Sequence, residues 1–167
     1  MKVKSFLCAA ALAASGALSP AQAATGAQDL QVMARAIGFV DGLSGNVPVA
    51  IVDGPGADAI IAAMSGNLSG GSITLQPRKV AVGDLASSGV KAIIVPEGMA
   101  GAHAQIGAAA QSLGAVTLST DMSCVTSGNC AVGVATSPRV DIIVSRAATS
   151  AAGIDFSQAF RVMIREQ

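Results

Sequence analysis

The chain has 167 residues, with ten acidic and ten basic side chains. Without a basic excess, the charge balance argues against a surface that would attract nucleic acid or anionic lipid. The sequence contains no Trp and no Tyr, which argues against aromatic platforms for sugars or bases. Apolar residues make up 51% of the chain and charged residues 12%, so the composition is that of a folded domain and not of a disordered one.

The first 23 residues have the pattern of an export signal. A basic start precedes an apolar run from Phe6 to Leu18, and Ala21-Gln22-Ala23 supplies the small-x-small motif at which signal peptidase cuts. The apolar run is shorter than the roughly 20 residues that a membrane-spanning helix needs, although an uncleaved anchor is the alternative. Cys8 lies in this run and would leave with it. We therefore predict a signal peptide over 1–23 and a periplasmic domain over 24–167, with no membrane insertion after cleavage.

Apolar spacing in the predicted domain alternates between helix and strand periods. Helices are predicted at 29–40, 58–64, 100–113, 146–152 and 156–164, with a helical turn at 84–89, a flexible loop at 66–72 and a tight loop at 124–130. Strands are predicted at 47–52, 73–75, 79–82, 91–95 and 115–119, followed by a hairpin of 131–135 and 139–145. The continuous apolar run Ala92-Ile93-Ile94-Val95 is typical of a buried parallel strand. The order predicts an α/β fold: a single three-layer Rossmann-like domain with a mostly parallel sheet and a C-terminal antiparallel hairpin.

The order of these segments resembles the periplasmic YfiR/HmsC-like family. The residues that carry the resemblance are Val49 to Pro55, Lys91 to Pro96, Ala115 to Asp121, Val140 to Val144 and, most specifically, Ala147 to Ile164. The resemblance covers nearly all of the predicted domain. The first predicted helix departs from the family because it lacks aromatic character, and the loop at 66–72 is unusually bare.

The resemblance implies a Rossmann-like domain that restrains an inner-membrane diguanylate cyclase by contacting its periplasmic part. Such a negative regulator responds to envelope conditions, including redox state, and thereby tunes cyclic-di-GMP signalling and biofilm growth. We therefore expect a protein that works by binding and not by catalysis, without a cofactor. The alternative is a periplasmic solute-binding protein linked to a transporter, in which a homodimer would build a cleft between two lobes.

Cys124 and Cys130 enclose only five residues, and in an oxidising compartment such a close pair predicts a disulfide. Gly128-Asn129 allows the tight turn that brings the two Cα atoms within bridging distance. Two interpretations stay open, a structural staple and a redox-sensitive switch. No metal site is expected, because two thiols and the distant His103 do not supply a tetrahedral ligand set.

Two turns that follow predicted strands form the candidate ligand cleft. They contain Asp53, Gly54 and Gly56 after one strand, and Glu97 and Gly98 after another. In open α/β sheets, ligands bind beyond the carboxyl ends of the strands. The simpler alternative is a plain turn followed by a helix that Asp58 caps.

Four arginines lie near the C-terminus: Arg139, Arg146, Arg161 and Arg165. The predicted helix at 156–164 would place Arg161 and Arg165 one turn apart, with Phe156, Phe160 and Met163 on its apolar face. The arginines are a candidate face for an acidic partner or an anion. A solvated face is the alternative.

His103 is the only histidine of the chain. We expect it to be structural, because the sequence shows no carboxylate near it except Glu97 and no nucleophile. Nothing in the chain matches a nucleophile elbow, a zinc protease helix or a phosphate-binding loop. Catalysis is therefore the minor hypothesis.

Overall fold

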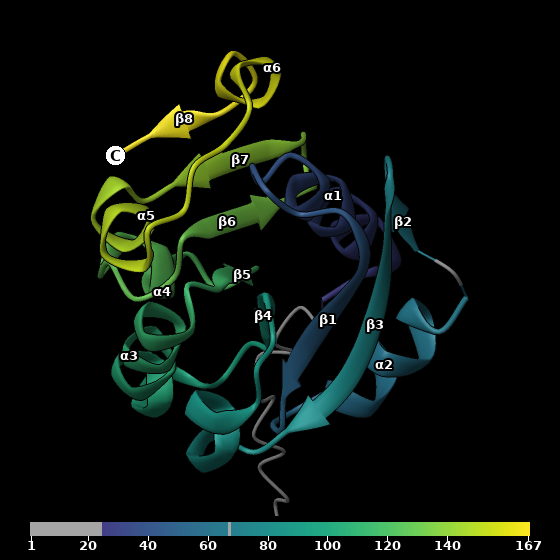
Figure 1. The fold of residues 1–167 in the computed structure, drawn as a ribbon, viewed down its shortest axis with the longest axis vertical. Coiled ribbons are helices and arrows are strands. Elements are labelled where there is room, and N and C mark those ends of the chain that lie inside the picture. The colour runs from purple at the N-terminus through teal and green to yellow at the C-terminus, as the bar shows by residue number, and fades with distance from the viewer. Residues whose placement is uncertain (1–24, 67) are drawn as a thin grey trace, which may run out of the picture.

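The computed structural model describes residues 25–66 and 68–167 (Figure 1). The predicted signal peptide over 1–23, with its Cys8, lies outside the described residues. Within them, no helix has the length and apolar character needed to cross a membrane.

Helices and strands alternate along most of the chain. The helices are α1 Ala27–Gly38, α2 Ala57–Met64, η1 Val82–Ser87, η2 Ala100–Ala102, α3 His103–Leu113, α4 Met122–Thr126, α5 Arg146–Ala152 and α6 Gln158–Arg161. The strands are β1 Gly45–Val52, β2 Ser69–Gly70, β3 Ile73–Val80, β4 Ala92–Val95, β5 Val116–Ser119, β6 Val132–Ala135, β7 Asp141–Val144 and β8 Arg165–Glu166.

The strands form a single sheet in the order β2-β3-β1-β4-β5-β6-β7-β8. The five strands from β3 to β6 in that order run parallel, so their carboxyl ends meet at one edge of the sheet. β2 and β7 are antiparallel to their inner neighbours, and β8 runs parallel to β7. This arrangement confirms the predicted α/β class, the mostly parallel sheet and the late antiparallel hairpin.

Helices cover both faces of the sheet because the central strands bury side chains on each face. In β1, Val49 and Ile51 belong to the core under α1 and α2, whereas Ala50 and Val52 belong to the core under η1, α3 and α4. Figure 1 shows α1 on one side of the central strands and α3 and α4 on the other. This confirms the three layers, and it leaves the strand ends as the surface on which a site can form.

The first two helices begin earlier than predicted. α1 starts after Gly26, and the carboxylate of Asp29 accepts a hydrogen bond from the Gly26 amide at 2.8 Å from inside the first turn. α2 has Gly56 as its N-cap, so Asp58 lies in the first turn and not at the cap. An acid inside the first turn still interacts favourably with the helix dipole, which is why each acid marked a helix start that lies one or two residues too late.

The segment predicted as a flexible loop contributes β2 to the sheet. Gly70 of β2 and Gly38 of α1 approach so closely that a Cβ on either glycine would overlap backbone atoms of the other element. The lack of a side chain at these positions therefore lets helix and strand pack in direct backbone contact. β3 continues through Pro77 as one strand, which an edge position tolerates because β2 pairs only with its first residues.

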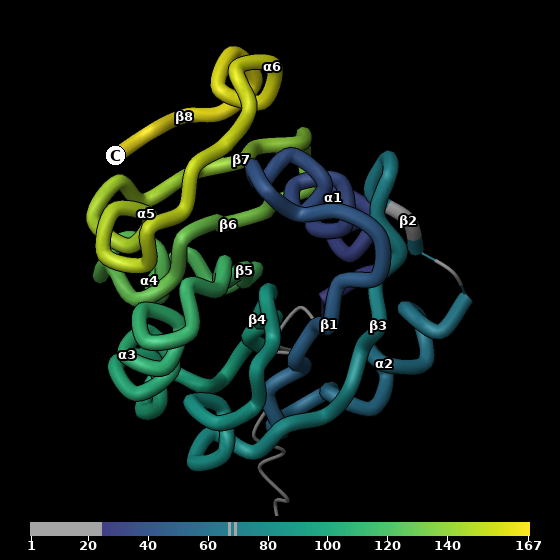
Figure 2. Tube along the Cα trace, in the orientation of Figure 1, coloured from purple at the N-terminus to yellow at the C-terminus, as the bar shows by residue number. Residues whose placement is uncertain are grey.

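The C-terminal prediction was wrong in part. α5 ends at Gly153, as predicted, but the expected helix over 156–164 forms only the single turn of α6. The chain then extends into β8, which pairs with the outer edge of β7, as the trace in Figure 2 shows. Phe160 is 1% exposed, whereas Met163 is 56% exposed and does not share its apolar face.

The region from Cys124 to Cys130 also differs from the predicted loop. Its first residues belong to α4, which Asp121 caps by accepting a hydrogen bond from the Ser123 amide. Asp121 caps the start of α4, and a short turn follows around Gly128. The helix and the turn together are so short that the sequence predicts a loop.

Candidate binding site at the carboxyl edge of the sheet

The two predicted turns lie side by side at the carboxyl edge. The chain leaves β1 through α2 on one face of the sheet to reach β3, and then returns through η1 on the other face to reach β4. The strand order therefore reverses at β1, which is where open α/β sheets place their ligands. Met99, after β4, packs so closely on Gly54, after β1, that a Cβ at Gly54 would overlap its sulfur.

A cleft of about 170 Å³ opens along this edge. We call it the carboxyl-edge cleft, and its polar lining residues are Asp29, Glu97, Thr120, Thr136 and Ser137. Of the residues predicted for a ligand cleft, Glu97 lines it. The prediction that Asp53, Gly54, Gly56 and Gly98 also contact a ligand stays a prediction.

Hydrogen bonds tie the start of α1 to the strand ends around this cleft. Asp29 accepts a hydrogen bond of 2.6 Å from the Thr136 hydroxyl, and the Thr25 and Thr120 hydroxyls are 3.2 Å apart. Asp29 is thereby held by groups of the protein itself. Glu97 forms no ion pair within residues 25–66 and 68–167, so its carboxylate is the charged group of the cleft that is available to a partner.

The acids beyond β1 face a lysine. Lys79, at the end of β3, donates a hydrogen bond of 2.7 Å to Asp58 and lies 3.9 Å from Asp53. The hydrogen bond and charge of Asp58 raise the pKa of Lys79 above its ordinary value. These side chains are exposed, so the pairs are solvated and contribute little to stability.

The structure joins Cys124 and Cys130 in a disulfide, with Cα atoms 5.2 Å apart. Both residues are 0% exposed and lie in the core under α3 and α4. The bridge links α4 to the start of β6, where the Ala131 amide donates a hydrogen bond of 2.7 Å to the Thr117 hydroxyl. Because a thiol must reach a sulfur atom to reduce it, burial makes reduction depend on local opening.

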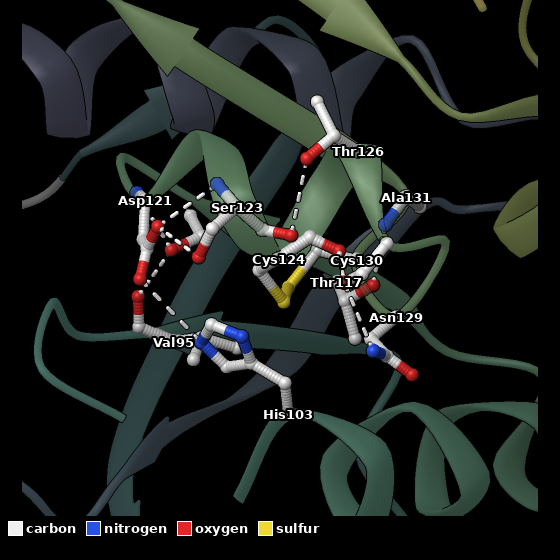
Figure 3. Close-up of a disulfide and its surroundings, with 12 residues drawn as sticks. Val95, His103, Thr117, Asp121, Ser123, Cys124, Thr126, Asn129, Cys130 and Ala131 are labelled. Atoms are coloured by element: carbon white, nitrogen blue, oxygen red, sulfur yellow. Dashed lines mark hydrogen bonds and ion pairs between the residues drawn. A yellow bond between two sulfur atoms is a disulfide. The ribbon is translucent and has the colours of Figure 1, made fainter. Parts of the chain in front are cut away.

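His103 lies beside this disulfide and has a carboxylate neighbour that the sequence analysis missed (Figure 3). Its Nε2 atom is 3.6 Å from Asp121 Oδ2, which is beyond hydrogen-bond distance, and it has no hydrogen-bond partner among the described residues. The Ser123 hydroxyl donates to the same carboxylate at 2.6 Å. Serine and histidine therefore both face the acid, which is not the order of a serine triad, where the histidine contacts the serine.

The adjacency of β4 and β5 could have revealed the pair of His103 and Asp121. Each residue follows its strand at the carboxyl edge, and adjacent parallel strands bring such positions together. Within the described part of the chain, no three His, Cys, Asp or Glu side chains are grouped as metal ligands would be.

Arg161 and Arg165 do not lie one turn apart on a helix, because Arg161 ends α6 and Arg165 begins β8. Arg165 belongs to β8 and forms a bidentate pair with Asp141, while Arg139 is exposed in the turn between β6 and β7. Arg146 and Arg161 line a different cavity at the other end of the sheet. The predicted spacing failed because the segment after α6 extends to pair with β7.

Comparison with known proteins shows the fold. No protein-family model matches the chain, and no curated protein matches its sequence. A conserved domain protein from Vibrio cholerae O1 biovar El Tor is similar in structure, with 14% identity and a TM-score of 0.55. So is an ABC domain from Streptococcus pneumoniae in complex with L-tryptophan, with 12% identity and a TM-score of 0.54. Each comparison covers 84% of this chain but 59% of the other chain, so the shared fold is only part of those proteins.

Proposed function

We propose that this protein is a periplasmic binding protein that acts as a negative regulator of an inner-membrane diguanylate cyclase. The observation that carries the proposal is the carboxyl-edge cleft, which lies beyond the ends of β4, β5 and β6 and presents the carboxylate of Glu97, a group without an ion-pair partner among the described residues. At about 170 Å³ the cleft is smaller than the roughly 300–1,000 Å³ of usual small-molecule pockets. It is therefore better suited to a polar side chain of a partner protein than to a whole solute.

In this mechanism the regulator holds the cyclase inactive while the two proteins are bound. Release requires a signal that binds or alters one state of the regulator more than the other. The buried disulfide supports a structural role for the bridge and restricts redox control to conditions that open α4. The predicted export signal and the resemblance to YfiR/HmsC-like proteins motivate the choice of partner.

Site-directed photocrosslinking in cells tests this proposal. A photoreactive amino acid replaces Glu97 in the cleft, and a matched control replaces Gln111, which is exposed near the far end of α3. We expect Glu97 crosslinks to a membrane protein that carries a diguanylate cyclase domain, with no such product from Gln111. Absence of that product at Glu97, or an equal yield at both positions, would contradict the proposal.

A second candidate is a solute-binding component of a transporter. The structural similarity to a domain that holds L-tryptophan favours it, because 84% of this chain matches that fold. Its partner would be a membrane permease. Recovery of a permease from the Glu97 crosslinks, in place of a cyclase, would favour this candidate.

A further inference from the structure

The cavity lined by Arg146 and Arg161 lies at the opposite edge of the sheet from the carboxyl-edge cleft. Its volume is about 410 Å³, which is within the range of small-molecule pockets. Val144 at the end of β7 and the segment from Gly153 to Phe156 form part of its wall. Val144 pairs with the first residue of β6, which places the cavity at the amino edge. We call it the amino-edge cavity.

Two ion pairs lie in the wall of this cavity. Arg146 Nε donates a hydrogen bond of 2.8 Å to Glu166 Oε2, and Arg161 Nη2 is 3.3 Å from Asp155 Oδ1. Arg161 Nε also donates to the Phe156 carbonyl at 3.0 Å. The side chains of Arg146 and Arg161 are 73% and 52% exposed, so the Nε contacts favour one orientation of each guanidinium while its other N–H groups face solvent.

These contacts leave much of the hydrogen-bonding capacity unused. A guanidinium has five N–H donors and a carboxylate accepts about four hydrogen bonds. Among the described residues, both terminal nitrogens of Arg146 and one terminal nitrogen of Arg161 have no protein partner. Asp155 Oδ2 and Glu166 Oε1 are likewise without one. The cavity therefore offers hydrogen-bond donors on positively charged side chains and hydrogen-bond acceptors on negatively charged side chains.

Apolar side chains complete the lining. Val144 is 2% exposed, Phe156 5% and Ile154 9%, so the protein core forms this part of the wall. Two positive and two negative side chains leave the lining without net charge. A simple anion would be attracted by the arginines and repelled by the carboxylates. A simple cation would be attracted by the carboxylates and repelled by the arginines. A ligand with a negative group, a positive group and an apolar part can contact the arginines, the carboxylates and the apolar wall at the same time.

We propose that the amino-edge cavity binds a free α-amino acid with an apolar side chain. The ligand carboxylate contacts the free edges of Arg146 and Arg161, its ammonium group contacts Asp155 or Glu166, and its side chain packs against Phe156. Bidentate contacts between arginine and carboxylate supply both affinity and orientation. This site is separate from the carboxyl-edge cleft, and it stands whether or not the protein regulates a cyclase.

Isothermal titration calorimetry of the purified protein tests the charge requirement with three related probes. L-leucine carries both charges, N-acetyl-L-leucine lacks the ammonium group, and L-leucinamide lacks the carboxylate. We expect saturable binding of L-leucine and at least tenfold weaker binding of the other two. Equal binding of N-acetyl-L-leucine would overturn the proposal in favour of a plain anion site, and absence of L-leucine binding would overturn it outright.

Variants locate the site. Arg146→Gln and Arg161→Gln should each weaken L-leucine binding at least tenfold, whereas Arg139→Gln in the exposed turn should leave it unchanged. Arg161→Lys keeps the charge but loses the planar pair of donors, so it should also weaken binding while preserving the fold. Unchanged binding in correctly folded Arg161→Lys and Arg146→Gln proteins would overturn the proposal.

Discussion

Removal of the disulfide tests whether the bridge is a staple, and the double variant Cys124→Ala/Cys130→Ala is the perturbation. The two cysteines are six residues apart in the sequence, so the closed loop is short. The loop-entropy relation gives a stabilisation of about 2 kcal/mol for a loop of this size. Both residues are fully buried, and the lost sulfur contacts add to that cost.

The assay is thermal and urea unfolding of the wild-type and double-variant proteins. A loss of about 2 kcal/mol corresponds to a decrease of roughly 4–8 °C in Tm for a domain of this size. The matched control is Thr126→Ala, which removes an exposed side chain from α4 without touching the bridge. An unchanged Tm in the double variant would refute the loop argument.

The same bridge should resist reduction in the native state. Thiol–disulfide exchange needs a thiolate to reach a sulfur atom, and the surroundings of both cysteines exclude it. We expect dithiothreitol to reduce the bridge much faster in denaturing urea than in buffer, as measured by thiol labelling and mass spectrometry. Equal rates under both conditions would refute the burial argument and revive the redox-sensing interpretation. Unchanged stability and cyclic-di-GMP in cells that carry the double variant would remove redox control from the proposed function.

The packing and the surface charges lead to three further predictions. Phe160→Ala should cost about 3–5 kcal/mol in urea unfolding, because Phe160 is 1% exposed, and a loss below 1 kcal/mol would contradict its core position. Gly70→Ala should cost about 1–3 kcal/mol because its Cβ would overlap α1, while in the control Gly66→Ala the Cβ makes only an ordinary van der Waals contact with the Ala63 carbonyl, so this change should cost far less. The pKa of Lys79 is raised by Asp58, so its pair contributes stability below pH 10.5 that is lost as the pH rises through the folded-state value. Lys79→Met should remove this alkaline dependence from pH-resolved unfolding curves, and persistence of the dependence would exclude Lys79 as its source.

Local patterns predicted most of the fold. The unbroken apolar runs of β1 and β4 can be buried on both faces only in the middle of a sheet covered by helices, and they lie there. Gly114 and Gly153 end their helices with positive φ, as expected for residues without a Cβ. These features depend on the backbone and on neighbouring residues, so the sequence alone contains the relevant information.

The candidate sites depended on contacts between segments that are distant in the chain. The proximity of Asp29 to Thr136, and of His103 to Asp121, follows from the strand order and not from spacing along the chain. The sequence also did not indicate that Arg165 lies apart from Arg146 and Arg161. That separation depends on β8, which forms because the outer edge of β7 offers unpaired backbone groups.

The sequence by itself determined the α/β class, the central strands, most helix ends and the pairing of Cys124 with Cys130. Hydrophobic periodicity determines the strands and helices, glycine positions determine where helices end, and the short distance along the chain determines the cysteine pairing. All three are local properties of the sequence. Only the tertiary structure decided which charges meet at the carboxyl edge and which at the amino-edge cavity. Electrostatic and hydrogen-bonding partners act over a few ångströms in space, and the strand order brings residues within that range regardless of their separation in the chain.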